Sequence, residues 1–147
     1  MNAPVKIFRW EYRIRFQDAD AAGILFYARI FDMFHDAYVV FLGELGRPLW
    51  KSLEISDVII PLVHADADYL APLRFGDMIR IDISVLDLSS KSFKLGYKVT
   101  RTEDSVWAAS GHTVHVSVLK EEFKSTSLPD DLRAALKEYH NMSSKRR

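Results

Sequence analysis

A single long helical segment lies between one strand and a run of further strands, and this order restricts the folds open to the chain. Residues 8–16, FRWEYRIRF, carry an apolar side chain at every second position, which is typical of a half-buried strand. Residues 27–45 carry apolar side chains at helical spacing, and strand patterns then dominate residues 57–119. An antiparallel sheet joined by short turns, with one face covered by the helix, buries the apolar surface of both. The order therefore predicts an α+β fold.

The helical segment is expected to be largely buried and to end near Gly43 or Gly46, because Pro48 follows and glycine favours the end of a helix. Its apolar stripe comprises Ile30, Phe31, Phe34, Tyr38, Phe41, Leu42 and Leu45.

The strands that follow are predicted at residues 57–70, 78–88, 92–101 and 106–119. Pro61 interrupts the first of them, which indicates an edge strand or a bulge. Residues 129–141 have the pattern of a short amphipathic helix. The chain shows no internal repeat or linker, so one domain over residues 1–147 is predicted, with its core at about 8–119.

The composition excludes several classes of function. Lysine plus arginine and aspartate plus glutamate both number 20, so no net field favours nucleic acid or an anionic membrane. The chain has no cysteine, which excludes disulfides, thiolate metal sites and a cysteine nucleophile and fits a reducing compartment. No stretch approaches the roughly 18 apolar residues of a membrane span, and the first residues have no signal-peptide core. A cytoplasmic protein without membrane insertion is expected.

Residues 18–23, DADAAG, resemble the start of a calcium-binding EF-hand loop. In that alignment the fifth position is Ala22, and the twelfth, where a bidentate glutamate belongs, is Arg29. A strand also precedes the motif where a helix is required. No metal site is therefore predicted here.

Two other interpretations of this motif remain open on physical grounds. Asp20 precedes a helix N-terminus, whose unpaired N–H groups and dipole stabilise a developing oxyanion. If Gly23 allows a sharp turn, backbone N–H groups near Phe26 and Tyr27 can hold a carbonyl oxygen while Asp20 attacks the carbonyl carbon or activates water. Alternatively, Asp18 and Asp20 are ordinary turn and cap residues.

Histidine and nucleotide chemistry receive little support from the sequence. His112 and His115 are three residues apart in a strand, so they point to opposite faces and cannot share a metal. His35 and His64 have ordinary places on a helix and a strand. The chain contains no G-x-S-x-G, Walker A or dinucleotide-binding motif.

Three segments resemble the hotdog-fold acyl-CoA thioesterases of the 4-hydroxybenzoyl-CoA thioesterase family: FQDADAAGILFYARIFDMFHDAY, IPLVHADADYLAPLRFGDMIRI and SSKSFKLGYKV. The resemblance runs from about Tyr12 to Val118. It implies a curved antiparallel sheet wrapped around one long helix, and hydrolysis of an acyl-CoA without a cofactor, coenzyme A being part of the substrate. It also implies dimers or tetramers with the site at a subunit interface.

The resemblance further implies roles for single residues. The aspartate directly before the A-x-G segment, Asp20 and not Asp18, is the implied nucleophile or general base, beside Gly23. The backbone N–H of Tyr27 is the implied oxyanion donor.

Substrate-binding residues are implied by the same resemblance. Lys91 matches a basic position that binds the phosphates of coenzyme A, although Ser89 and Ser90 replace further basic residues of some relatives. A likeness to 1,4-dihydroxy-2-naphthoyl-CoA hydrolases makes His64 and His35 candidate pocket residues and favours an aromatic acyl group. A short-chain aliphatic acyl-CoA thioesterase and a non-catalytic acyl-CoA-binding or regulatory hotdog protein remain alternatives.

Overall fold

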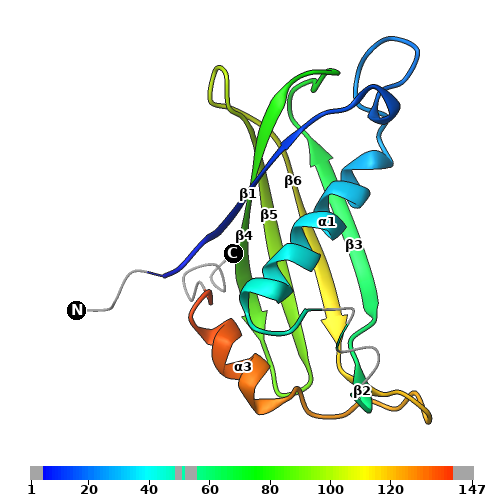
Figure 1. Cartoon of the computed structure of the whole chain (residues 1–147), viewed down its shortest axis with the longest axis vertical. Coiled ribbons are helices and arrows are strands. Elements are labelled where there is room, and N and C mark those ends of the chain that lie inside the picture. Colours follow the sequence, from blue (N-terminus) through cyan, green and yellow to red (C-terminus); the bar gives the residue numbers. More distant parts are fainter. Residues whose placement is uncertain (1–4, 49–50, 52–55, 141–147) are drawn as a thin grey trace.

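The computed structural model of the chain describes residues 5–48, 51 and 56–140. Its elements, in chain order, are β1 (Phe8–Arg13), a 3-10 turn η1 (Phe16–Asp18), α1 (Arg29–Glu44), β2 (Val58–Ile59), β3 (Leu62–Tyr69), β4 (Met78–Leu88), β5 (Ser92–Arg101), β6 (Val106–Val116), β7 (Val118–Leu119) and α3 (Asp130–Lys137) (Figure 1).

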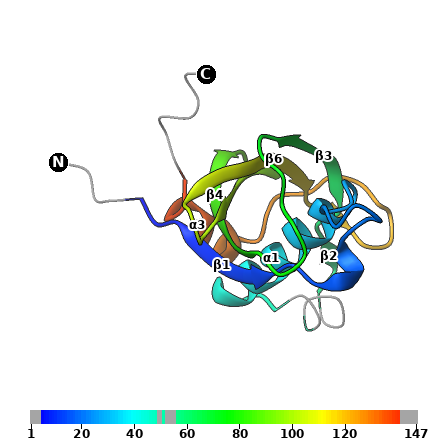
Figure 2. The same cartoon turned by 90° about the horizontal axis from the view of Figure 1, so that it is seen from above.

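Five strands form one antiparallel sheet in the order β1-β4-β5-β6-β3, and β2 pairs with β7 in a separate two-stranded ribbon. Seen from above, the sheet curls around α1, which lies inside the curve (Figure 2). This arrangement confirms the predicted α+β fold with a curved antiparallel sheet around one long helix. The outer strands β1 and β3 each have one edge that pairs with no other strand of the described residues.

The face of α1 that meets the sheet is fully apolar. Its buried residues recur every three or four positions and are Ile30, Met33, Phe34, Ala37, Tyr38, Phe41 and Leu42. Phe34 stacks on Tyr97 of β5 with ring centroids 4.3 Å apart, and its ring packs so close to β6 that a Cβ at Gly111 would overlap it. Phe31 was predicted in the stripe but is 36% exposed, because the buried face turns towards Met33 and Ala37.

Both ends of α1 have an identifiable cause. The helix begins at Arg29, two residues later than predicted, because the carbonyl of Tyr27 accepts a hydrogen bond from the hydroxyl of Tyr69 and not from the helix. At the other end Gly46 has a φ of +83°, and the N–H of Arg47 donates to the carbonyl of Leu42 at 2.9 Å. This is the glycine-terminated helix end that the sequence predicted.

β1 ends earlier than its alternating pattern predicted. Ile14 is fully buried, but Phe16 lies in η1, is 77% exposed and contacts Phe75 with ring centroids 5.6 Å apart. The prediction that the strand reaches Phe16 was wrong, because the side chain of Asp18 accepts the N–H of Arg15 at 2.8 Å and turns the chain out of the strand.

Pro61 separates β2 from β3, and the β3–β6 register shifts just after it, between Leu62 and His64. The predicted edge strand with an irregularity is therefore confirmed. The last predicted strand is likewise split into β6 and β7 at Ser117.

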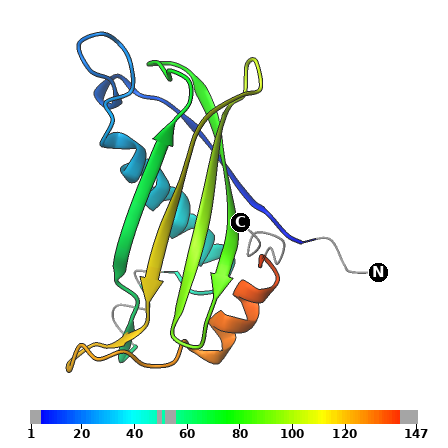
Figure 3. The same cartoon turned by 180° about the vertical axis from the view of Figure 1, so that it is seen from behind.

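α3 closes the end of the sheet that lies away from the start of α1 (Figure 3). Leu132 and Leu136 are fully buried, and Tyr139 meets Phe41 of α1 edge-on at 5.0 Å. The short amphipathic helix predicted from the sequence thus completes the core. None of the described helices has the length and apolarity that crossing a membrane requires.

Candidate active site

Residues 18–28, here called the opening turn, connect η1 to α1 and present Asp20 to solvent. The Asp20 Oδ1 atom accepts the backbone N–H groups of Ala22 at 2.8 Å and Ile24 at 3.3 Å. The backbone N–H of Asp20 donates to the carbonyl of Ile24 at 2.8 Å. No hydrogen-bond donor in residues 5–48, 51 or 56–140 reaches Oδ2. One carboxylate oxygen is therefore held in place while the other is available to a substrate or a water.

Gly23 makes the sharp turn that the sequence predicted. Its φ is +79°, and its N–H donates to the carbonyl of Asp20 at 2.9 Å. A Cβ would meet no atom within 4 Å, so the conformation, not space, favours glycine here. The turn folds the chain back on Asp20 and brings its own N–H groups to the carboxylate.

The opening turn delivers an unpaired backbone donor just before α1. The N–H of Phe26 donates to the carbonyl of Asp18 at 2.9 Å, and the carbonyl of Phe26 accepts the N–H of Arg29 at 2.9 Å. The N–H of Tyr27 belongs to the same peptide unit as that carbonyl, and it makes no hydrogen bond to any described residue. Neither Asp18 nor Asp20 caps α1, which has no side-chain cap.

A hollow of about 390 Å³ lies beside the opening turn. Its lining is mainly apolar and consists of Ile24, Leu25, Tyr27 and the five residues from Tyr69 to Leu73. The two walls are joined by the bond from the Tyr69 hydroxyl to the Tyr27 carbonyl and by that from the Leu25 N–H to the Leu73 carbonyl, 2.8 Å long.

Asp18 has a structural environment. It is 2% exposed, and its Oδ2 accepts the hydroxyl of Tyr12 at 2.6 Å and the N–H of Arg15 at 2.8 Å. Burial acts to raise the pKa of Asp18, but these hydrogen bonds outweigh it and hold that pKa below its usual value. Burial and the bond to Asp18 raise the pKa of Tyr12 to about 12. Oδ1 of Asp18 lies 3.5 Å from Nη2 of Arg15 and the residue is almost fully buried, so Asp18 fixes the exit from β1 and is not accessible to a substrate.

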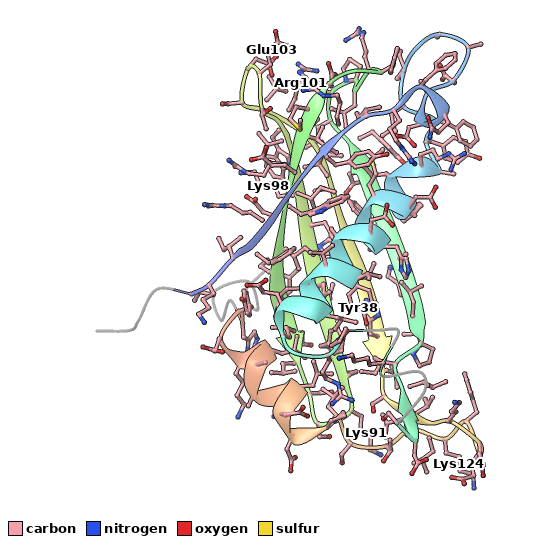
Figure 4. All side chains as sticks on the ribbon, viewed as in Figure 1. Tyr38, Lys91, Lys98, Arg101, Glu103 and Lys124 are labelled. Carbon is pink, nitrogen blue, oxygen red and sulfur yellow. The ribbon has the colours of Figure 1, made fainter. Side chains whose placement is uncertain are left out.

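The remaining predicted site residues do not gather around Asp20 in one protomer. His35 is exposed on α1, its ring 6.1 Å from that of Tyr38. Lys91 lies at the β4–β5 turn, at the end of the sheet away from the opening turn, and its ammonium has no ion pair with the described part of the chain (Figure 4).

His64 belongs to a separate polar group on β3 and β6. Asp66 binds two imidazoles, through Oδ2 to His64 Nε2 and through Oδ1 to His112 Nδ1, both at 2.9 Å. Burial acts to raise the pKa of Asp66, but the bonds from His112 and His64 hold it below its usual value. Ala67 packs against the core, so Asp66, one position away on β3, points to the other face of the sheet. The two imidazoles that it binds lie on that same face.

His115 is a buried residue for which no functional role was predicted. Its ring stacks between Tyr38 and Phe93 at 4.3 and 5.0 Å, and its Nε2 bonds to the hydroxyl of Thr113 at 2.9 Å (Figure 4 labels Tyr38). Burial, aided by the nearby His35, lowers the pKa of His115 to about 4, so the ring is neutral at physiological pH. His115 and His112 point to opposite faces, as predicted, and the described residues contain no group of three ligands that could hold a metal.

Tyr69 was also missed as a residue of this region. The only sequence signal was its place at the start of Y-L-x-P-L-R-x-G-D, a segment that reads as a strand end followed by a turn. Its hydroxyl contacts the opening turn 42 residues earlier in the chain, and no local pattern encodes such a contact.

Comparison with known proteins identifies the family of the chain and supports the hotdog fold described above. Residues 14–136 match the family described as the Thioesterase-like superfamily. A 1,4-dihydroxy-2-naphthoyl-CoA hydrolase of Rippkaea orientalis is 34% identical over 129 residues, which are 87% of this chain and 94% of that protein.

Two solved structures are similar throughout the fold. A 1,4-dihydroxy-2-naphthoyl-CoA thioesterase from Synechocystis superposes with a TM-score of 0.84 at 27% identity, covering 89% of this chain and 96% of that one. A gentisyl-coenzyme A thioesterase superposes with a TM-score of 0.79 at 32% identity, covering 88% and 99%. With a curved sheet around α1 and a family match over most of its length, this chain is a hotdog-fold enzyme that belongs to the Thioesterase-like superfamily.

Proposed function

We propose that this protein hydrolyses the thioester of an aromatic acyl-CoA to the free acid and coenzyme A, with Asp20 as the reacting carboxylate. The observation that carries the proposal is the state of the Asp20 side chain. One of its oxygens is fixed by the turn at Ala22 and Ile24, and the other has no partner among the described residues. A fixed carboxylate with a free lone pair can act as a general base or a nucleophile.

The opening turn supplies the second element that thioester hydrolysis needs. The N–H of Tyr27 has no acceptor in the described parts of the chain and precedes α1, whose positive end favours a developing negative charge. As the carbonyl carbon becomes tetrahedral, its oxygen accepts this N–H. Gly23 is the residue whose φ lets the turn form.

The general-base reaction proceeds in two steps. Asp20 takes a proton from a water molecule while the water oxygen bonds to the thioester carbon, and the carbonyl electrons move to the oxygen held by Tyr27. When these electrons return, the carbon–sulfur bond breaks, and the thiolate takes the proton from Asp20. The products are the carboxylic acid and the free thiol. In the covalent alternative Asp20 itself bonds to the carbon, the carbon–sulfur bond breaks and the thiolate leaves. Water then hydrolyses the mixed anhydride, which releases the acid, restores Asp20 and supplies the proton that the thiolate takes up.

An aromatic acyl group is supported by the relatives and by the surroundings of the turn. The similar proteins act, by their names, on naphthoyl and gentisyl thioesters. Phe26, Tyr27 and Tyr69 are all exposed at this end of the molecule, and Phe26 and Tyr27 have ring centroids 4.9 Å apart. Flat aromatic side chains of this kind stack on a planar ligand. His35 and His64 are proposed to lie along the path of the substrate.

The complete site is proposed to require a second copy of the chain. β3 is an edge of the sheet that no described strand covers, and its residues Leu62 and Val63 are 52% and 57% exposed. Such an edge favours pairing with another strand. Tyr69 ends β3 and bonds to Tyr27, so a copy paired along β3 lies next to the opening turn.

Lys91 fits this arrangement as a contribution from the partner. Within one protomer it lies at the far end of α1 from the opening turn, and a helix of 16 residues spans about 24 Å at about 1.5 Å per residue. Antiparallel pairing of two β3 strands about a two-fold axis places the end of one copy that carries the β4–β5 turn beside the end of the other copy that carries the opening turn. The partner's copy of this lysine is then available to the phosphates of coenzyme A bound near Asp20.

Release of free thiol from purified protein tests the proposed reaction. Naphthoyl, benzoyl, short aliphatic and long aliphatic CoA esters are compared, and the highest kcat/KM is expected for an aromatic ester. Faster turnover of a short aliphatic ester would show that the proposed acyl group is wrong. If the protein binds every ester but releases no thiol, the proposed hydrolysis is wrong and the protein is a non-catalytic acyl-CoA-binding protein.

The Lys91 proposal has its own test. Lys91→Gln is expected to raise KM for the CoA ester about three- to tenfold with kcat nearly unchanged, because one charge-assisted phosphate contact is lost. Lys124→Gln is the matched control and should leave KM unchanged. It removes an exposed lysine from the turn that follows β7 (Figure 4). If Lys91→Gln and Lys124→Gln have the same KM, Lys91 does not bind the phosphates of coenzyme A.

A further inference from the structure

Tyr69 connects β3 to the opening turn through one side-chain hydroxyl. That hydroxyl donates to the carbonyl of Tyr27, although the two residues are 42 positions apart in the chain. Burial raises the pKa of Tyr69, with a smaller contribution from the nearby Tyr27, so its hydroxyl keeps the proton that it donates. The acceptor is the carbonyl of the residue whose own N–H has no acceptor in the described chain.

Tyr27 is thereby fixed on both sides. The peptide unit before it, which contains the N–H of Tyr27, is held because the carbonyl of Phe26 accepts the N–H of Arg29. The peptide unit after it contains the carbonyl bound by Tyr69. Two fixed peptide planes leave the backbone of Tyr27 little freedom, because only φ and ψ connect them. Without Tyr69 only the first plane would be held.

The remaining contacts between the two segments lie further from Tyr27. The N–H of Leu25 donates to the carbonyl of Leu73 at 2.8 Å, and the N–H of Phe75 donates to the carbonyl of Gly23 at 3.3 Å. These bonds hold the first half of the opening turn against residues 69–75. Among the described contacts between these two segments, the Tyr69 hydroxyl is the one that reaches Tyr27, which lines the hollow of about 390 Å³.

We infer that Tyr69 is a positioning residue for thioester hydrolysis: its hydroxyl locks the Tyr27–Ala28 peptide plane and so holds the N–H of Ala28, which has no acceptor among the described residues, as a second donor to the reacting carbonyl oxygen after the N–H of Tyr27. The inference rests on the proposed function. A donor that is already oriented gains more in the transition state than one that must be ordered during the reaction. A hydrogen bond on the Tyr27 carbonyl also polarises the N–H of Ala28, which belongs to the same peptide unit.

Tyr69→Phe tests this role because it removes the hydroxyl and keeps the ring in the lining of the hollow. The expected result is a fall in kcat of about tenfold, the loss of one oriented hydrogen bond, with KM within about twofold of the wild type. Tyr139→Phe is the matched control. It removes a tyrosine hydroxyl at the α3 end of the core, where the ring packs against Phe41, and kcat should not change.

A second readout does not depend on turnover. In protein labelled with 13C at the Tyr27 carbonyl and with 15N at Ala28, Tyr69→Phe is expected to move both chemical shifts, and Tyr139→Phe should move neither. If Tyr69 only stabilised the fold, Tyr69→Phe would instead lower the melting temperature, and kcat and KM of the folded protein would both stay at their wild-type values.

The outcomes separate the inference from the proposed function. If the wild type releases thiol and Tyr69→Phe has the same kcat, the positioning role of Tyr69 is wrong. The proposed role of Asp20 in hydrolysis is then unaffected. Unchanged chemical shifts would overturn it on structural grounds. Wild-type protein that releases no thiol would overturn the proposed function and, with it, any catalytic consequence of the bond.

Discussion

The tripeptide Asp-Ala-Asp occurs twice in this chain, at residues 18–20 and 66–68, and the two copies have different environments. In the first copy Asp18 is buried under Tyr12 and Arg15 while Asp20 is exposed in a turn. In the second copy the residues alternate across β3, so both aspartates point to the outer face of the sheet.

The comparison shows that the backbone decides what an aspartate can do. In a strand, residues two apart share a face and a similar exposure. In the opening turn the chain reverses between Asp18 and Ile24, so one carboxylate is enclosed by the end of β1 while the next meets the N–H groups of its own turn. Of the two copies, this one lies at the start of the turn that leads into α1.

Exchange of the carboxylate that is proposed to react should have the largest effect. Asp20→Asn keeps an oxygen for the N–H groups of Ala22 and Ile24 but loses the base, and kcat for a CoA ester is expected to fall at least a hundredfold. The matched variant in the other copy is Asp68→Asn, whose side chain is exposed and makes no hydrogen bond to a described residue. It should retain full activity.

Both variants should keep the melting temperature of the wild type within about 2 °C, because each exchanges an exposed side chain. Retention of wild-type turnover in Asp20→Asn would exclude Asp20 as the reacting group. A similar loss of activity in Asp68→Asn would mean that the two copies do not differ in function as proposed.

Asp18→Asn should affect stability more than any other exchange in the two copies. The neutral amide oxygen accepts the Tyr12 hydroxyl and the Arg15 N–H more weakly than a charged oxygen does, and about 2–3 kcal/mol of unfolding free energy is expected to be lost. Chemical denaturation at pH 7 measures this loss. Activity per folded molecule should fall much less than in Asp20→Asn.

The pH dependence of stability provides a separate test of Asp18. Its pKa is lower in the folded protein than in the unfolded chain, so its contribution is present above about pH 4 and is lost as the pH falls through the lower, folded value. The wild type should therefore lose stability more steeply than Asp18→Asn in this acid range. Parallel stability curves for the two proteins would contradict the assigned hydrogen bonds.

Asp66→Asn is expected to have the smallest measurable effect. Asp66 bonds to two imidazoles, but its side chain is 41% exposed and that of His64 is 58% exposed, so solvent screens the pairs. The expected loss is at most about 1 kcal/mol of unfolding free energy at neutral pH. Denaturation of Asp66→Asn beside Asp68→Asn measures the difference, and a loss as large as that of Asp18→Asn would show that Asp66 is held more tightly than its exposure indicates.

Local sequence patterns predicted the element types, their order and most of the buried faces. Alternation in β4, where Ile79, Ile81 and Ile83 are fully buried, and helical spacing in α1 are local properties of the chain, so they can be read without the fold. The same local reasoning found the acid before a helix, the turn at Gly23 and the glycine that ends α1.

Contacts between distant segments were decided only by the tertiary structure. The strand order that leaves β3 at an edge, the burial of Asp18 beside an exposed Asp20, and the bond from Tyr69 to Tyr27 all depend on how segments dozens of residues apart meet. Local patterns report which face of an element is apolar but not which partner covers it, because packing and cross-chain hydrogen bonds form between whole elements. For this reason the sequence indicated Asp20 as a candidate acid before a helix, and the fold showed that the N–H groups of Ala22 and Ile24 hold its Oδ1 atom.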